Sequence, residues 1–203
     1  MRFNYREDHL ALISELVAPF AKGDEAERIA RMLINKYRTF SNVLSADASE
    51  LSDMLGAGLA AHLKLVAYAT SRRGTERFAF GKRHTDEEIS EYFKSLYVGA
   101  SVEITYLMLF DSEGRALKVV KIGEGTVNSS EIIPRKMVEA AMSVGAASVL
   151  VAHNHPLGNC RPSADDLSFT AKIATVLETV GVKMYGHLIV AGRGANLVDF
   201  SLL

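Results

Sequence analysis

Residues 147–166 read ASVLVAHNHPLGNCRPSADD, and no other stretch says as much about the fold of this chain. The stretch opens on an apolar, β-branched run that predicts a buried strand, Ala147–Ala152. His153 and His155 follow at positions i and i+2, which point to the same side of an extended chain. A loop containing Pro and Gly then leads to a new helix, whose first turn carries Asp166. The spacing therefore predicts that two imidazoles and one carboxylate meet at one point.

Two neutral histidine nitrogens and one carboxylate oxygen are a usual ligand set for a catalytic zinc ion, because they leave a fourth position open for water. A second interpretation applies to the same residues. Ser163 and Asp166 also have the spacing of a helix start, with Ser as N-cap and an acid reaching back to the cap amide. The two interpretations are compatible, since the cap fixes the helix that presents Asp166.

The pattern His-x-His-Pro, six residues, then Ser-x-x-Asp resembles the zinc motif of the JAMM/MPN metalloprotease superfamily. Within it, the chain most resembles the bacterial RadC-like (JAB/MPN) proteins, which carry HNHP. Their Gly-Thr…Ser…Pro-Arg stretch is matched over residues 125–135, and their His-Leu-Ile strand by His187–Ile189. The resemblance covers residues 86–203 well and the rest loosely.

The resemblance implies a site as well as a fold. His153, His155 and Asp166 would hold Zn²⁺, which lowers the pKa of a bound water towards ~7. Glu103, just ahead of a long predicted strand, would be the general base, although by itself it reads as a solvated Glu at a strand end. The Ser163 hydroxyl would bind the developing oxyanion. The implied activity is a zinc-dependent hydrolysis of peptide or isopeptide bonds, with a protein or peptide as substrate.

The loop after the histidines departs from the family pattern. It keeps only Gly158 and the final Pro162-Ser163, and Gly186 stands where an Asp is common. These changes lie beside the expected metal, so an altered substrate preference is expected. Cys160 lies in the same loop, and we interpret it as a loop residue because the zinc ligand set is complete without it.

Composition indicates a protein of the cytoplasm. The apolar share of 48% is ample for a packed core, and no apolar run approaches the ~20 residues that span a bilayer. The first ten residues are charged and lack the apolar centre of a signal peptide. The single cysteine cannot form an internal disulfide, which fits a reducing compartment.

Periodicity predicts an α/β fold with a mixed sheet flanked by helices, preceded by a small all-helical domain. The resemblance implies that the sheet is of the MPN (JAB) type, within a metalloprotease-like domain over 86–203, and that the helical domain over 1–70 is helix-hairpin-helix-like. A charged, glycine-containing linker is expected over 71–85. Helices are expected at 9–21, 25–38, 48–70 (two short helices), 86–96, 134–144 and 164–180. Strands are expected at 103–110, 115–123, 147–152, 183–190 and 196–199.

The hairpin-like segment Leu55–Ala61 contains a Gly-x-Gly turn whose amides could meet a phosphate. Lys64 is the only cation between Arg38 and Arg72, however, and residues 1–74 hold ten Lys/Arg against nine Asp/Glu. Phosphate binding relies on clustered cations. We therefore expect weak or no nucleic-acid binding through residues 1–70, and protein contacts instead.

Two other functions are weighed against the peptidase. A non-catalytic DNA-associated or scaffold protein of the RadC-like family is the alternative, since some MPN domains have lost their metal residues. A zinc nucleobase deaminase requires His-x-Glu and Pro-Cys-x-x-Cys. The single cysteine excludes that class. The natural substrate and the oligomeric state do not follow from the sequence.

Overall fold

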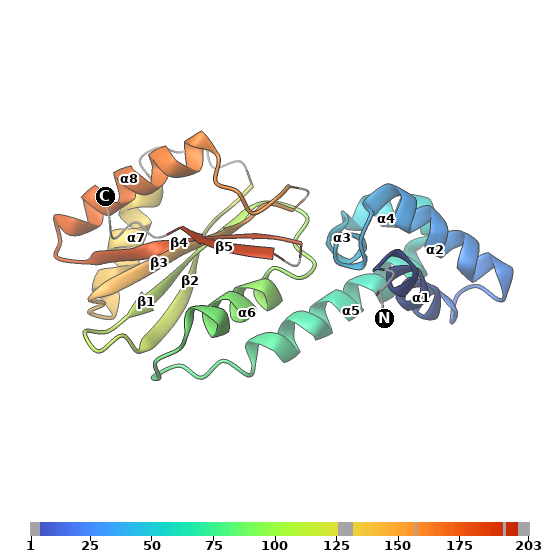
Figure 1. Cartoon of the computed structure of the whole chain (residues 1–203), viewed down its shortest axis with the longest axis horizontal. Coiled ribbons are helices and arrows are strands. Elements are labelled where there is room, and N and C mark those ends of the chain that lie inside the picture. The colour runs from blue at the N-terminus through green and yellow to red at the C-terminus, as the bar shows by residue number, and fades with distance from the viewer. Residues whose placement is uncertain (1–4, 126–131, 157, 193, 199–203) are drawn as a thin grey trace. The chain divides into compact units, whose positions relative to one another are not determined.

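The N-terminal part of the chain is helical in the computed structural model (Figure 1). The structure describes residues 5–125, 132–156, 158–192 and 194–198. The chain divides into two compact units. The first contains the residues up to Arg73 with Val98–Ser101, and the second contains Gly74–Tyr97 and the residues from Val102 onward.

Five helices build the first unit, as far as its residues are described. They are α1 (Tyr5–Val17), α2 (Asp24–Tyr37), α3 (Phe40–Ser45), α4 (Ala48–Leu55) and α5 (Ala57–Thr75). Their apolar positions meet in one core that includes the fully buried Ile13, Leu33, Leu51 and Leu63. Helix-period apolar residues therefore pack as expected, because each helix buries one stripe against its neighbours.

Helix α2 confirms the predicted helix over 25–38, whereas α3 was not predicted. At six residues, α3 is too short for an apolar period to be recognised. It begins at a capping residue instead: the Thr39 hydroxyl accepts a hydrogen bond of 3.1 Å from the backbone amide of Asn42.

Helix α5 continues to Thr75, so residues 71–75 of the predicted linker are helical. Gly74 lies against Ser95 of α6 (Asp86–Leu96), and a Cβ added to Gly74 would be 2.3 Å from the Cβ of Ser95. The glycine thus allows the end of α5 to approach α6 closely.

The rest of the predicted linker is also ordered against the second unit. Phe78 stacks on His84 with ring centroids 3.9 Å apart, and it packs against Tyr92 of α6. The amide of Gly81 donates to the carbonyl of Ala116, and the amide of Ala116 donates to Lys82, both at 2.8 Å. Because charged residues surround Phe78 in the sequence, the packing of its ring was not predicted.

A five-stranded mixed sheet forms the centre of the second unit. Its strands are β1 (Ile104–Phe110), β2 (Ala116–Glu124), β3 (Ser148–Asn154), β4 (Lys183–Ala191) and β5 (Gly194–Val198). The order is β2-β1-β3-β4-β5, with β3 and β4 parallel and the other pairs antiparallel. The predicted mixed sheet flanked by helices is confirmed.

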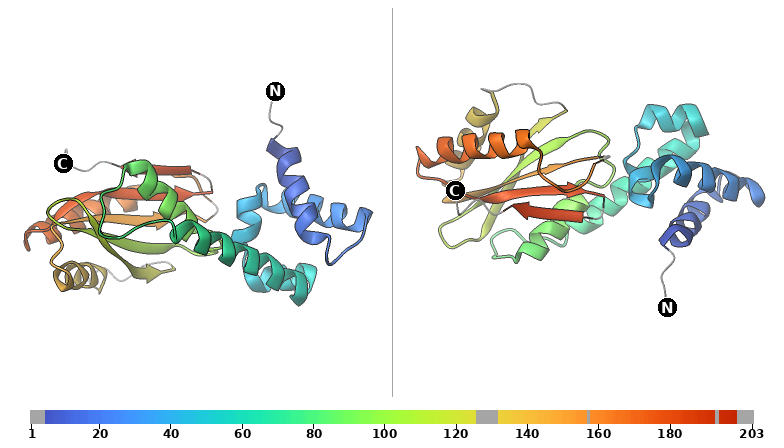
Figure 2. Two further views of the ribbon diagram at one scale, coloured as in Figure 1. Left: turned by 90° about the horizontal axis from the view of Figure 1, so that it is seen from below. Right: turned by 45° about the horizontal axis from the view of Figure 1, so that its top comes forward.

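Helices cover both faces of this sheet, as Figures 1 and 2 show. On one face, Leu107 and Val151 pack with α7 (Ile132–Ser143) and α8 (Ala164–Glu178). On the other face, Met108 and Ala152 pack with α6. Because successive side chains of a strand alternate between faces, a strand covered on both sides reads as one continuous apolar run.

None of the helices in the described ranges combines the length and the apolar character that crossing a bilayer requires. Residues 126–131 belong to the Gly-Thr…Ser…Pro-Arg stretch of the predicted resemblance and lie outside the described residues.

Candidate metal centre

Three side chains converge where β3 ends and α8 begins. The Nε2 atoms of His153 and His155 are 2.8 Å apart. Asp166 Oδ1 lies 3.2 Å from His153 Nε2, and its Oδ2 lies 3.5 Å from His155 Nε2. In the described part of the chain, this is the one group of three or more His, Cys, Asp or Glu residues with ligand atoms that could share an ion.

The strand positions both histidines on one side. His153 pairs with Thr105 of β1 and with Ile189 of β4, on the face that α8 covers. The amide of His155 donates to the carbonyl of Val190 at 2.8 Å, which continues the β3–β4 pairing by one residue. The i, i+2 spacing therefore works as the sequence predicted.

Close packing at Gly158 holds the loop after β3 against His155. A Cβ added to Gly158 would be 3.0 Å from the Cβ of His155, so a larger residue would displace the imidazole or the loop. Cys160, partly exposed in this loop, is not in the converging group.

A capping box holds Asp166. Ser163 donates to Oδ2 of Asp166 from both its hydroxyl and its backbone amide, each at 2.7 Å. The Asp166 amide in turn donates to the Ser163 hydroxyl oxygen at 3.1 Å. The capping interpretation of this pair is confirmed, and the cap at Oδ2 leaves Oδ1 directed at His153.

Burial sets the protonation of the site. Burial lowers the pKa of His153 from 6.5 to about 4, and the nearby Asp166 offsets only part of this effect. Burial alone would raise the pKa of Asp166, but the hydrogen bonds from Ser163 and the two histidines outweigh it and lower that pKa. At neutral pH the centre therefore presents a neutral imidazole beside a carboxylate.

The second nitrogen of each histidine has its own partner. Nδ1 of His155 lies 2.8 Å from the carbonyl oxygen of Asn159. Nδ1 of His153 lies 2.7 Å from Nε2 of the buried His187 in β4. Nδ1 of His187 lies 2.6 Å from the hydroxyl of Thr170 in α8. Sequence reasoning missed both His187 and Thr170 as members of the site, because they lie far from the histidines along the chain.

These partners show that the centre fits a cation. The Asn159 carbonyl can only accept, so a neutral His155 carries its proton on Nδ1 and offers a lone pair at Nε2. That lone pair faces another ring nitrogen and a carboxylate, all of which are electron donors. A positive charge shared between them satisfies all three, and two imidazoles with one carboxylate is a set that Zn²⁺ accepts.

Glu103 is exposed at the start of β1. Its carbonyl accepts a 2.7 Å hydrogen bond from the Gly125 amide, which extends the β1–β2 pairing. Thr105 is opposite His153 in the register, and side chains at i and i+2 of a strand share a face. Continued one residue ahead of β1, this alternation would bring Glu103 to the face that carries the histidines.

Asn154 links Glu103 to the histidine strand. Its Oδ1 accepts from the Ile104 amide at 2.7 Å, and its Nδ2 donates to the Val102 carbonyl at 3.0 Å. The buried amide therefore holds the peptide groups on both sides of Glu103. The sequence marks Asn154 as a polar residue next to the core but does not show what it bonds.

Gly186, the other departure from the family pattern, lies in β4 next to β5. A Cβ added there would be 3.0 Å from Leu197 Cδ1 and 3.1 Å from the Val198 carbonyl oxygen. The close approach of β5 accounts for the glycine at this position.

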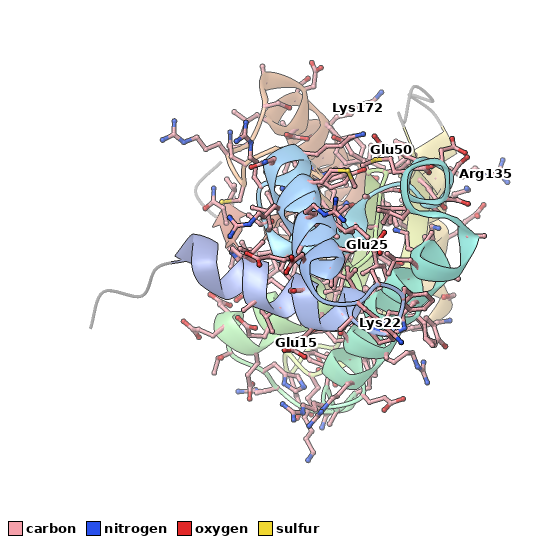
Figure 3. All side chains as sticks on the ribbon, turned by 90° about the vertical axis from the view of Figure 1, so that its right-hand side faces the viewer. Glu15, Lys22, Glu25, Glu50, Arg135 and Lys172 are labelled. Atoms are coloured by element: carbon pink, nitrogen blue, oxygen red, sulfur yellow. The ribbon has the colours of Figure 1, made fainter. Side chains whose placement is uncertain are left out.

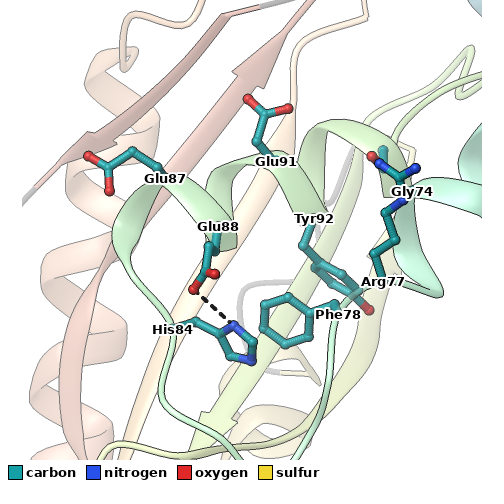
Figure 4. Close-up of a pocket in the computed structure, with 9 residues that line it drawn as sticks. Gly74, Arg77, Phe78, His84, Glu87, Glu88, Glu91 and Tyr92 are labelled. Atoms are coloured by element: carbon teal, nitrogen blue, oxygen red, sulfur yellow. Dashed lines mark hydrogen bonds and ion pairs between the residues drawn. The ribbon is translucent and has the colours of Figure 1, made fainter.

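A concavity of about 420 Å³ lies along α6 (Figure 4). Phe78 and Tyr92 line it together with Glu87, Glu88 and Glu91, and Nδ1 of His84 lies 3.2 Å from a carboxylate oxygen of Glu88. None of the converging ligands is part of it. Because α6 and α8 cover opposite faces of the sheet, this pocket is separate from the metal centre.

Comparison with known proteins agrees with this architecture. Residues 83–201 match the model of the RadC-like JAB domain. A UPF0758 protein of Actinobacillus pleuropneumoniae is 30% identical over 190 residues, covering 89% of this chain and 84% of the relative. A UPF0758 protein of Photorhabdus laumondii is 32% identical over 188 residues, covering 87% and 80%. The chain therefore belongs to the RadC-like JAB domain family.

Proposed function

We propose that the protein is a zinc-dependent hydrolase of peptide or isopeptide bonds, a JAMM-type metallopeptidase. The observation that carries the proposal is the convergence of His153, His155 and Asp166 at the end of β3. Family membership supports a JAMM-related fold around these residues. A non-catalytic scaffold needs no such ligand set, so the alternative is not favoured.

Three residues would bind the metal ion. His153 and His155 would bind Zn²⁺ through Nε2, and Asp166 through Oδ1, the oxygen that the Ser163 cap leaves available. Zinc, when bound, supplies a water of lowered pKa and polarises the carbonyl to be cleaved. The ligand atoms of the three residues lie within 4.8 Å of one another.

Glu103 would take a proton from the attacking water and pass it to the leaving amine. Its exposed carboxylate and its place on the histidine face support this role. Ser163 would stabilise the oxyanion, for which its hydroxyl proton must leave Asp166 Oδ2, where the cap now directs it.

We propose a protein or peptide as the partner, with weak or no nucleic-acid binding by the first unit. The Lys64 ammonium donates to the carbonyls of Leu44 and Gly99, at 3.0 and 3.4 Å, so it is engaged within the unit. Phe20 covers Gly58 of the hairpin, where an added Cβ would be 3.5 Å from its ring.

Acidic and basic side chains are mixed on this unit: Glu15, Glu25 and Glu50 lie with Lys22 on the face that Figure 3 shows. Binding to a nucleic-acid backbone requires clustered positive charge, whereas residues 1–74 hold ten Lys/Arg against nine Asp/Glu. The single cysteine supports a cytoplasmic setting for this partner and substrate.

Metal analysis tests the proposal directly. Purified protein should hold about one zinc ion per chain, and the double variant His153→Ala/His155→Ala should hold none while staying folded. His62→Ala, a histidine of the first unit, is the matched control and should keep the metal. An unchanged zinc content in the double variant would refute the ligand assignment.

The general base is tested separately, with quenched peptides and lysine isopeptides as substrates. Glu103→Gln should keep its zinc and lose ~10²–10⁴-fold in hydrolysis, because only the proton transfer is removed. Glu113→Gln, in the exposed β1–β2 turn, is the control and should hydrolyse normally. Equal rates for the two variants would transfer the base role to another residue.

A further inference from the structure

Behind the metal centre, three buried side chains and one carbonyl form a continuous chain of hydrogen bonds. It runs from Nδ1 of His153 to Nε2 of His187 at 2.7 Å, and from Nδ1 of His187 to the Thr170 hydroxyl at 2.6 Å. The Thr170 hydroxyl then meets the backbone carbonyl of Asp166 at 2.5 Å. Thr170 is fully buried, and His187 is 2% exposed, so neither has an alternative partner in water.

The proton positions follow from the carbonyl end of this chain. A carbonyl can only accept, so the single hydroxyl proton of Thr170 is donated to Asp166. The Thr170 oxygen must then accept from Nδ1–H of His187. A neutral, buried His187 has its second nitrogen, Nε2, as an acceptor. That acceptor requires a proton on Nδ1 of His153, which leaves the lone pair of His153 on Nε2.

We propose that Thr170 and His187 are positioning residues that fix His153 as its Nδ1–H tautomer and so direct the Nε2 lone pair at the metal. This inference rests on the proposed zinc site. The same tautomer is required from the metal end, because a ligating Nε2 cannot carry a proton. The Asp166 carbonyl at one end of this series of hydrogen bonds and the metal at the other therefore require the same proton positions.

This series of hydrogen bonds from His153 through His187 to Thr170, here called the relay, also connects two of the proposed ligands, His153 and Asp166. Thr170 lies one helical turn after Asp166, and its hydroxyl bonds the carbonyl of that residue. The helix that presents Asp166 therefore orients His153 on β3 as well. His155 differs, because the main-chain carbonyl of Asn159 orients it without a side-chain relay.

Matched substitutions separate the relay from ordinary packing. Thr170→Ser keeps the hydroxyl, whereas Thr170→Val has the same shape and removes it. His187→Gln keeps an acceptor near the Nε2 position, whereas His187→Leu removes it. The Thr170 pair alone is decisive should His187→Leu fail to fold.

Two measurements are made on each variant. Zinc and Co²⁺ affinity, by competition with a chromophoric chelator, should fall ~10–100-fold in Thr170→Val and His187→Leu. It should stay close to wild type in Thr170→Ser and His187→Gln. Long-range ¹H–¹⁵N spectra of the metal-free protein should show the Nδ1–H tautomer of His187 in wild type and Thr170→Ser, and its loss in Thr170→Val.

The two measurements can contradict the relay and the proposed function separately. Equal tautomers and equal zinc affinity in Thr170→Val and Thr170→Ser would overturn the relay and leave the proposed hydrolase intact. A wild-type protein that binds no zinc would end the proposed function. The tautomer spectra of the metal-free protein would then still decide whether Thr170 controls His187.

Discussion

Asn154 lies between the two histidines in sequence and points to the opposite face of β3. It is 3% exposed, and its amide bonds one peptide group on each side of Glu103. A buried amide in this position needs both partners, because an unsatisfied polar group costs about 1–3 kcal/mol. The residue therefore couples the strand that carries the histidines to the segment that carries the proposed base.

We expect Asn154→Leu to lose about 1–3 kcal/mol of unfolding free energy, since the Ile104 amide and the Val102 carbonyl both lose their partner. Zinc content should remain, and hydrolysis should fall because Glu103 is no longer held. Urea unfolding, metal analysis and the peptidase assay measure these three effects. Asn154→Leu with wild-type stability and rate would show that the amide does not position Glu103.

Helix α8 carries more of the site than any other element. Its N-cap is Ser163, its first turn holds Asp166, and its second turn holds Thr170, which reaches His187 on β4. The cap residue therefore holds one proposed ligand directly, and Thr170 of the same helix contacts His187, which lies next to the second. A change at the start of this helix should alter metal binding and stability together.

We expect Ser163→Ala to lower the unfolding free energy of the metal-free protein by about 1 kcal/mol, through loss of the cap. It should also weaken zinc binding, because the hydroxyl no longer orients Oδ2 of Asp166. Ser163→Thr keeps the hydroxyl and is the control in urea unfolding and chelator competition. Should the Ala and Thr variants prove equally stable, the cap contributes nothing measurable.

At the scale of the whole molecule, the two units have separate cores, and every proposed ligand lies in the second. The segment between Gly74 and Thr85 packs with that second unit through Phe78 and through the backbone bonds of Gly81 and Lys82 to Ala116. A fragment boundary within this segment would remove packing that the sheet and α6 use.

A fragment that starts at Gly74 should fold and keep its zinc, since it retains this packing. A fragment that starts at Lys82 lacks Phe78, and we expect it to unfold at lower urea concentration than the longer fragment. Circular dichroism during urea titration, followed by metal analysis, compares the two. Equal midpoints would show that residues 74–81 add no stability to the second unit.

Features that depend on neighbours along the chain were predictable before the fold was known. Apolar periods identified most helices and all five strands, and α6 has the predicted bounds. The i, i+2 spacing of His153 and His155 and the Ser163–Asp166 cap are local patterns, so they were recognisable as a possible ligand set before any packing was known.

The side chains that surround the proposed ligands could be identified only in the folded protein. His187 follows His153 by 34 residues, and Asn154 reaches a segment about 50 residues earlier. Which buried polar groups meet across such separations depends on strand order and register, since a shift of one residue moves every side chain to the other face. A local period carries no record of that register, and for this reason the partners of Thr170, His187 and Asn154 could be identified only in the folded protein.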